Sequence, residues 1–293
     1  MYEQHFPYET IRDQQKEAIE FSLQAFNEGK RFVIIEAGTG VGKSAIGYTI
    51  SKSLSGETIA DPDSVSKGAW FVTTQKLLQD QYVRDYNTLG MKSIKSSTNF
   101  QCKFKKWNTC SDSQKELKAE SKGTKFWNTC VMNCVYKKAK EDFLKSTASV
   151  TNFPYLLTES NYSGKITKRQ LLIIDEAHNL ENELTRFIEI SVSSYFADKI
   201  LNLKVSSNIK TQLQVFNWIK TVYLNKLRQK INFISSQLEK FGITSTKLDD
   251  FKKITNRYEM LTSHEAKITR FIEIYDKDNW VFDVEETNDK YKK

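Results

Sequence analysis

The stretch from Arg31 to Ser44, RFVIIEAGTGVGKS, constrains what this chain can fold into more than any other part of it. The short apolar run from Phe32 to Ile35 predicts a buried parallel strand. Alternating glycines then predict a tight loop, and Lys43 with Ser44 opens an apolar segment that predicts a helix. In this order, a strand, loop and helix form a cradle whose backbone N–H groups surround phosphate oxygens. The sequence therefore predicts a nucleotide site.

The chemistry of this loop assigns roles to its residues. Lys43 is expected to reach the β- and γ-phosphates, and Ser44 to be a ligand of Mg²⁺. The strict pattern has glycine where this chain has Ala37, which is small enough for the turn. The expected nucleotide contacts are Ala37, Gly38, Thr39, Gly40, Val41, Gly42, Lys43 and Ser44. The alternative is a glycine-rich loop without a ligand.

Two polar residues near the N-terminus, Arg12 and Gln15, precede an amphipathic helix. The amide of a glutamine can donate and accept at once, so Gln15 could read the adenine edge of ATP. We therefore include both residues among the candidate nucleotide contacts.

A second motif, LLIIDEAH, runs from Leu171 to His178. Its apolar half predicts a strand that ends in two carboxylates, at the edge of the sheet where the phosphate loop also lies. Asp175 could hold Mg²⁺, and Glu176 could orient and deprotonate an attacking water. His178 could contact neighbouring loops. We predict catalytic roles for Lys43, Asp175, Glu176 and His178.

The segment from Lys92 to Lys145 concentrates the positive charge of the chain. It contains 13 lysines, no arginine and 5 acidic residues, so its net charge of +8 equals that of the whole chain. Aromatic residues are interleaved with the lysines, which is typical of contact with nucleic acid. The alternative is a solvated lysine-rich surface. The segment shows little pattern of strand or long helix before Cys134, after which a helix is expected.

All four cysteines of the chain, Cys102, Cys110, Cys130 and Cys134, lie in this same segment. Disulfides are not expected in an intracellular protein. Their spacing is not that of the usual zinc pairs, whereas an iron–sulfur cluster needs only four thiolates brought together by the fold. Spacing alone leaves a cluster, a zinc site and free thiols open.

The remainder of the chain predicts helices. Apolar residues recur at near-heptad spacing from Leu213 to Phe241 and again from Phe251 to Tyr275, with a short connection that begins at Gly242. These runs predict an antiparallel helical hairpin. The sequence has no apolar run long enough to span a membrane and no N-terminal signal pattern, so we expect no membrane contact and a cytoplasmic location, with the nucleus or a virus-infected host cell as alternatives.

These motifs together resemble the N-terminal half of XPD/DinG-type superfamily 2 DNA helicases, the iron–sulfur branch of the DEAH-box helicases. The matching stretches are Arg12-x-x-Gln15, the phosphate loop, TQKLLQDQ from Thr74 to Gln81, STNFQC ending at Cys102, CVY from Cys134 to Tyr136, TNFPYLL from Thr151 to Leu157 and IDEAHNL from Ile174 to Leu180. The resemblance covers residues 6 to about 184 and continues through the helical part only by architecture.

The resemblance implies an α/β fold: a RecA-like P-loop NTPase lobe with a parallel sheet, interrupted by an iron–sulfur cluster domain and followed by an all-α, arch-like hairpin. The expected divisions are 1–90, first part of the lobe; 91–148, cluster domain; 149–184, second part of the lobe; and 185–293, arch. The implied cofactors are ATP, Mg²⁺ and a [4Fe–4S] cluster held by the four cysteines.

The implied function is ATP-dependent unwinding of DNA with 5′ to 3′ polarity, in replication or repair, on single-stranded or forked duplex DNA. The stretch that resembles the family does not reach its motif III or its second motor lobe, so we expect the chain alone to be weakly active and a second chain to supply that lobe. The alternatives are a non-motor nucleic-acid-binding half-helicase and a zinc-stabilised, RNA-directed ATPase.

Overall fold

A computed structural model of the chain describes residues 2–55, 66–118, 120–205, 209–240 and 248–283. The chain divides into two compact units, Met1–Phe187 and Ile188–Lys293. The elements up to the end of the first unit are η1 (Glu3–His5), α1 (Asp13–Asn27), α2 (Lys43–Leu54), β1 (Ser66–Thr73), α3 (Lys76–Tyr86), η2 (Asn87–Leu89), β2 (Lys92–Ser93), η3 (Ser97–Asn99), α4 (Cys110–Leu117), α5 (Lys125–Met132), α6 (Val135–Lys145), β3 (Ala148–Asn152), α7 (Phe153–Thr158), η4 (Glu159–Ser163), β4 (Arg169–Ile174), η5 (Ala177–Asn179) and α8 (Leu180–Ile188).

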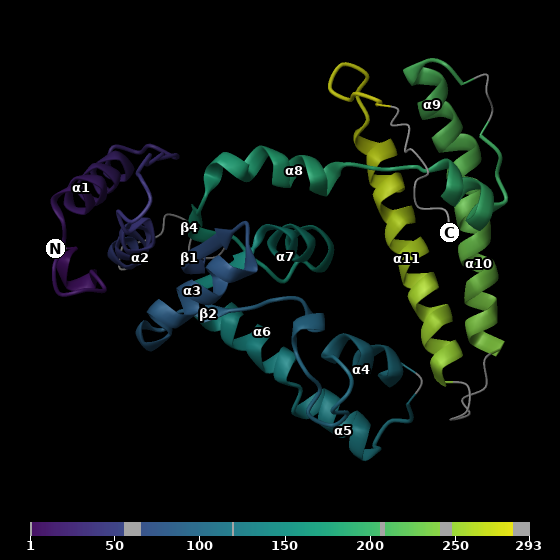
Figure 1. The fold of residues 1–293 in the computed structure, drawn as a ribbon, viewed down its shortest axis with the longest axis horizontal. Coiled ribbons are helices and arrows are strands. Elements are labelled where there is room, and N and C mark those ends of the chain that lie inside the picture. Colours follow the sequence, from purple (N-terminus) through teal and green to yellow (C-terminus); the bar gives the residue numbers. More distant parts are fainter. Residues whose placement is uncertain (1, 56–65, 119, 206–208, 241–247, 284–293) are drawn as a thin grey trace. The chain divides into compact units, whose positions relative to one another are not determined.

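The first unit is built on a parallel sheet with the strand order β2-β3-β1-β4 (Figure 1). In the centre, Phe71 of β1 lies in register with Val150 of β3 on one side and Ile173 of β4 on the other. Parallel strands need crossover connections, which this chain supplies with helices. The α/β class expected from the sequence is therefore confirmed.

Helices α2 and α3 cover one face of this sheet. Ala69, Phe71 and Val150 pack there against Tyr48 of α2 and Tyr82 of α3. Successive strand residues point to opposite faces, so the residues that alternate with these, such as Trp70, pack in a second core on the other face. All residues of β1 from Ala69 to Thr73 are buried, because helices cover both faces of the sheet.

The opposite face is covered by α6 and α7. Trp70 of β1 packs there with Ile94, with Phe143 of α6 and with Tyr155 of α7. The Trp70 and Phe143 rings stack with their centroids 4.8 Å apart. These aromatic contacts anchor the lysine- and cysteine-rich segment to the sheet at its C-terminal helix.

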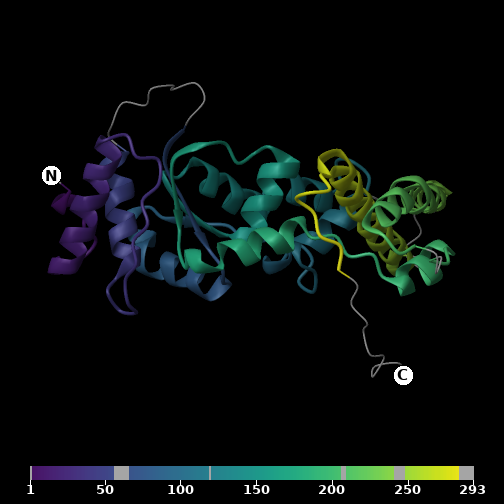
Figure 2. The ribbon, with the colours of Figure 1, turned by 90° about the horizontal axis from the view of Figure 1, so that it is seen from above.

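The predicted strand from Phe32 to Ile35 is wrong. These residues have no regular secondary structure, and the side chains of Phe32 and Ile34 are 82% and 89% exposed. A strand forms by pairing its backbone with a neighbour, and within the described residues β4 ends the sheet with no strand beyond it. Ile35 packs instead on the core of α1 and α2, which lie side by side (Figure 2).

The lysine- and cysteine-rich segment contains the short helices α4, α5 and α6. Thr109 caps α4 by accepting a hydrogen bond from the Asp112 N–H, and Thr124 caps α5 in the same way from the Trp127 N–H. Such caps satisfy N–H groups that the first turn of a helix leaves unpaired. Short capped helices give this segment local order although it has little apolar content.

The second unit is helical. Its elements are η6 (Phe196–Ile200), α9 (Gln212–Trp218), η7 (Ile219–Tyr223), α10 (Leu224–Lys240) and α11 (Leu248–Ile274), where η6 and η7 are π-helical. The expected hairpin is present: α9, η7 and α10 follow one another directly, and α10 packs along α11 through a core that includes Leu227, Ile234, Leu261 and Ile268 (Figure 1). The predicted connection at Gly242 lies outside the described residues.

No helix in the described part of the chain combines the length and apolar character that a membrane span requires. The longest described helix, α11, carries charged residues along its length.

A hydrogen-bonded pair inside the helical unit, buried Tyr223 and half-buried His264, predicts acid sensitivity. The Tyr223 hydroxyl lies 2.8 Å from Nε2 of His264, and the ring of Phe196 packs edge-on against the imidazole. Burial, and then the charge of Lys267, lower the pKa of His264 below its ordinary value of 6.5. The unfolded chain therefore takes up a proton near pH 6.5 that the folded unit resists. Stability should fall as the pH drops below that value.

We expect hydrogen exchange in α10 and α11, corrected for intrinsic rates, to show weaker protection at pH 5.5 than at pH 7.5. His264→Gln keeps a hydrogen-bonding side chain that does not titrate, so its protection should depend less on pH. Equal protection of the wild-type helices at both pH values would contradict this interpretation.

Candidate nucleotide site

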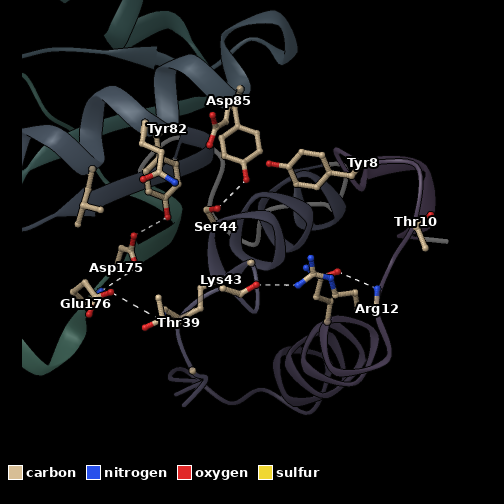
Figure 3. Close-up of a pocket in the computed structure, with 17 residues that line it drawn as sticks. Tyr8, Thr10, Arg12, Thr39, Lys43, Ser44, Tyr82, Asp85, Asp175 and Glu176 are labelled. Carbon is tan, nitrogen blue, oxygen red and sulfur yellow. Dashed lines mark hydrogen bonds and ion pairs between the residues drawn. The ribbon is translucent and has the colours of Figure 1, made fainter.

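The predicted phosphate loop and the carboxylates after β4 line one pocket of about 480 Å³ in the first unit. Its wall includes Lys43 and Ser44 from the start of α2, and Asp175 and Glu176 from the end of β4 (Figure 3). The two motifs lie far apart in the chain, and the fold brings them together. The size is in the range of small-molecule sites.

The phosphate loop has the backbone that its glycines predict. Gly40 and Gly42 have φ angles of 85° and 87°, a region that side-chain-bearing residues rarely adopt. A Cβ on Gly42 would also lie 2.5 Å from Nε2 of Gln15, so the end of the Gln15 side chain would have to move. The positive φ is therefore what requires glycine at this position.

Arg12 and Gln15 hold this loop from the N-terminal side. Nη1 of Arg12 donates to the carbonyl of Gly40 at 2.9 Å, and Nε2 of Gln15 donates to the carbonyl of Val41 at 2.8 Å. Oε1 of the buried Gln15 accepts from the backbone N–H of Arg12 at 3.0 Å. Both ends of the Gln15 amide therefore contact protein backbone, and adenine reading by this residue stays a prediction.

Lys43 links the two motifs. Its amino group donates to the carbonyl of Ala37 at 3.2 Å and lies 3.9 Å from Oε1 of Glu176 (Figure 3). The other carboxylate oxygen of Glu176 lies 3.3 Å from Nδ1 of the exposed His178. Thr39 also lines the pocket, whereas the side chain of Val41 packs on the core of α1 and α2.

Glu176 adopts a strained backbone. Its φ of 56° lies in the left-handed region, which costs on the order of 1–3 kcal/mol for a residue other than glycine. Strain of this kind persists where the surroundings enforce it, often at functional sites. The conformation turns the chain sharply after β4 and leaves the Glu176 side chain beside Lys43.

The residues present fit Mg²⁺. Burial, and then the neighbouring charge of Glu176, raise the pKa of the Asp175 carboxyl above its ordinary value. A divalent cation would relieve that repulsion, and carboxylate and hydroxyl oxygens are ligands that Mg²⁺ accepts. Protein sites for Mg²⁺ use one or two carboxylates together with phosphate oxygens, which matches Asp175 and Ser44 in a phosphate-binding pocket.

Three tyrosines that the motif analysis missed also line the pocket: Tyr8, Tyr82 and Tyr86. Tyr82 and Tyr86 stand four residues apart in α3, so they share one face of that helix. That spacing is visible in the sequence, but the same pattern also describes an ordinary core-facing stripe.

The four cysteines gather in one place. Cys102 and Cys130 lie within hydrogen-bonding reach of each other, as do Cys110 and Cys134, and charge on Cys102 or Cys134 acts on the other thiols. Burial and the neighbouring thiols raise the pKa of Cys110 and of Cys130 to about 11. Among the described residues, no group of three or more acidic, histidine or cysteine side chains is arranged to hold a single metal ion.

Hydrogen bonds favour the thiolate at one of these positions. Burial raises the pKa of Cys102, but donors that include the Lys105 N–H at 3.4 Å outweigh burial and leave that pKa lowered. All four cysteines are free of disulfides.

An exposed tryptophan stands out in the same segment. The Trp107 side chain is 99% exposed, and it lies between the exposed Lys106 and the turn that leads into α4. Further exposed lysines of the segment are Lys103, Lys122, Lys125, Lys137 and Lys138. The segment therefore presents an exposed aromatic ring and several exposed lysines.

The fold and the pocket define a P-loop NTPase lobe of the RecA-like type. Over residues 9–211 the chain matches the family model described as type III restriction enzyme, res subunit. The match spans more than half of the chain, and the chain belongs to this family. This is a family of helicase-type ATPases, which use ATP and Mg²⁺.

A solved chain named XPD helicase is similar to this one, with 17% sequence identity and a TM-score of 0.49. The similarity covers 91% of this chain and 51% of the XPD helicase chain, so this chain spans about half the length of that structure. Comparison with curated protein sequences finds no match.

The site predicts that Lys43→Ala weakens nucleotide binding. A hydrogen bond to a charged group contributes roughly 1.5–3 kcal/mol, so the affinity for MgATP in calorimetry should fall by one to two orders of magnitude or more. Lys52→Ala is the matched control, because Lys52 lies on the same helix but outside the pocket lining. Unchanged affinity in Lys43→Ala would count decisively against this site.

Proposed function

We propose that this chain is the ATP-binding, DNA-engaging half of an XPD/DinG-type DNA helicase. The observation that carries the proposal is the single pocket shared by the phosphate loop and the Asp175–Glu176 pair. Lys43 and the loop backbone would bind the phosphates of ATP, and Ser44 and Asp175 would hold Mg²⁺, which stabilises charge on the transferring phosphoryl group when bound.

Glu176 is the candidate base. In this proposal it orients the attacking water and accepts its proton, while His178 holds the other carboxylate oxygen at 3.3 Å. Lys43, 3.9 Å from Glu176, keeps that carboxylate near the phosphates. Arg12 and Gln15 bind the loop rather than the transferring group, so they would set its geometry.

The lysine-rich segment from Lys92 to Lys145 is the proposed nucleic-acid contact. Its local charge of +8 would attract the phosphate backbone, and the exposed ring of Trp107 offers a surface on which a base can stack. Single-stranded or forked DNA as the substrate, 5′ to 3′ polarity and a role in replication or repair rest on sequence resemblance and belong to this proposal.

We further propose that Cys102, Cys110, Cys130 and Cys134 hold a [4Fe–4S] cluster. Their mutual proximity and their enclosure by short helices support this. No group of three or more cysteine, histidine or acidic side chains among the described residues is arranged to hold a metal ion, so the cluster itself is proposed from the sequence resemblance. Bound metal would hold together a segment with little apolar core. Free thiols in this number also fit an intracellular location.

Unwinding requires two motor lobes that close over ATP, and the arginine that a second lobe supplies is worth roughly 10³ to 10⁵ in turnover. We therefore propose that a second polypeptide segment completes the motor. In that case the 293-residue chain hydrolyses ATP slowly and displaces no strand by itself.

Trp107→Ala should weaken the response to DNA. Base stacking contributes roughly 1–3 kcal/mol, so the single-stranded DNA concentration for half-maximal binding, and for any stimulation of ATP hydrolysis, should rise about tenfold. Met132→Ala is the control, since Met132 is also exposed in this segment but has no aromatic face. The affinity should also fall steeply with salt.

Three outcomes would redirect the proposal. Stimulation by RNA but not by DNA of equal length favours the RNA-directed ATPase. DNA binding without any ATP turnover, with or without a second chain, favours the non-motor binder. Robust strand displacement by this chain alone contradicts the need for a second lobe.

The cluster proposal predicts the metal content. Protein purified without oxygen should be brown, absorb near ~400 nm and contain about four iron atoms and four sulfides per chain. Cys130→Ser should lower the iron content and weaken hydrogen-exchange protection in α4 and α5. Protection in α2 and β1 should change little, because their cores lack cysteines. Stoichiometric zinc without sulfide would disprove the cluster.

A further inference from the structure

Helix α3 reaches both candidate Mg²⁺ ligands. The Tyr82 hydroxyl donates to Oδ2 of Asp175 at 3.3 Å, and the Tyr86 hydroxyl donates to Oγ of Ser44 at 2.9 Å (Figure 3). The two ligands come from different motifs, one at the end of β4 and one at the start of α2. A single helix therefore contacts both sides of the metal position.

The tyrosine rings are fixed by their surroundings. Tyr82 and Tyr86 are 4% and 0% exposed. Tyr86 stacks on Tyr48 of α2 with ring centroids 5.0 Å apart and planes 6° apart, and Tyr82 packs on Phe71 of β1 with centroids 5.6 Å apart. The hydroxyl groups cannot turn to water without moving these rings. A phenol hydroxyl is protonated at neutral pH, so each can donate a hydrogen bond.

These contacts fix the orientation of the ligand oxygens. Oδ1 of Asp175 accepts from the Glu176 N–H at 3.0 Å, so with Tyr82 on Oδ2 both oxygens of the carboxylate are held and its plane is set. On Ser44, a bond from Tyr86 leaves the serine proton and a lone pair for other partners. Partners of this kind orient metal ligands and tune their affinity.

We propose that Tyr82 and Tyr86 are positioning residues that aim Asp175 and Ser44 at Mg²⁺. The inference rests on the proposed nucleotide site. Neither tyrosine needs to touch the metal or the phosphates. Removing the Tyr82 hydroxyl leaves Asp175 held only at Oδ1, and removing the Tyr86 hydroxyl takes this contact from Ser44. An outer contact of this type is typically worth 10- to 100-fold in metal affinity.

The test removes the hydroxyl groups and keeps the rings. Tyr82→Phe and Tyr86→Phe are made singly, and binding of a fluorescent ATP analogue is measured with EDTA and then across a MgCl₂ titration. We expect the half-saturating Mg²⁺ concentration to rise at least 10-fold in each variant, while binding in EDTA stays unchanged. Direct binding of Mn²⁺ to the nucleotide-loaded protein, followed by electron paramagnetic resonance, should weaken in parallel.

Tyr48→Phe is the matched control. Tyr48 belongs to the same aromatic cluster, but its hydroxyl donates to the Leu89 carbonyl at 2.9 Å and not to a ligand. Its variant should keep the wild-type Mg²⁺ dependence. If only one phenylalanine variant folds, that variant still tests the positioning role of its own tyrosine, at Asp175 for Tyr82 or at Ser44 for Tyr86.

The outcomes separate this inference from the proposed function. A wild-type protein that binds no nucleotide with Mg²⁺ would overturn the site itself. Wild-type binding that depends on Mg²⁺, with the same dependence in Tyr82→Phe and Tyr86→Phe, would overturn the positioning role alone. An equal shift in Tyr48→Phe would assign the effect to packing and would also overturn it.

Discussion

The packing of α2 on the sheet is the contact on which the nucleotide site depends. Residues 32–36 do not enter the sheet, so strand pairing cannot place the phosphate loop. Helix α2 does so instead, because Gly47 lets it approach β4: a Cβ there would lie 3.2 Å from Ile173. On its other side, α2 buries Ile46 and Ile50 in the core with Ile19 of α1, which adds roughly 1.5–3 kcal/mol per side chain. Lys43 and Ser44 begin this helix, and the same packing brings them to Asp175.

The loop is then held by hydrogen bonds from several elements. Arg12 and Gln15, near the N-terminus, donate hydrogen bonds to its carbonyl groups. Tyr86 of α3 donates a hydrogen bond to Ser44. A flexible glycine loop pays a large entropy cost to adopt one shape. Contacts that exist before the nucleotide arrives lower that cost, which is the general advantage of a preorganised site. The strained backbone of Glu176 is likewise held in place before a nucleotide binds.

The charge of the chain is separated from its nucleotide chemistry. The segment from Lys92 to Lys145 carries the whole net charge, yet it joins the sheet through uncharged contacts such as Phe143 on Trp70. Some of its lysines are paired, for example Lys105 with Glu116 and Lys140 with Glu159. Others, such as Lys103, Lys106 and Lys122, are exposed and could contact a polyanion. This arrangement places the proposed nucleic-acid contact on a segment whose lysines do not line the nucleotide pocket.

The sequence by itself predicted the two motifs that line the pocket, because the glycine loop and the Asp175–Glu176 pair are local patterns that can be recognised without the fold. It also determined the α/β class and the helical hairpin, since periodicity over long segments is a strong signal. It did not determine whether Phe32–Ile35 pairs, because an apolar run becomes a strand only beside a neighbour that the tertiary structure supplies. The roles of Tyr82 and Tyr86 were likewise decided by the fold: helical spacing puts them on one face, and only packing against α2 and β4 brings that face to Ser44 and Asp175.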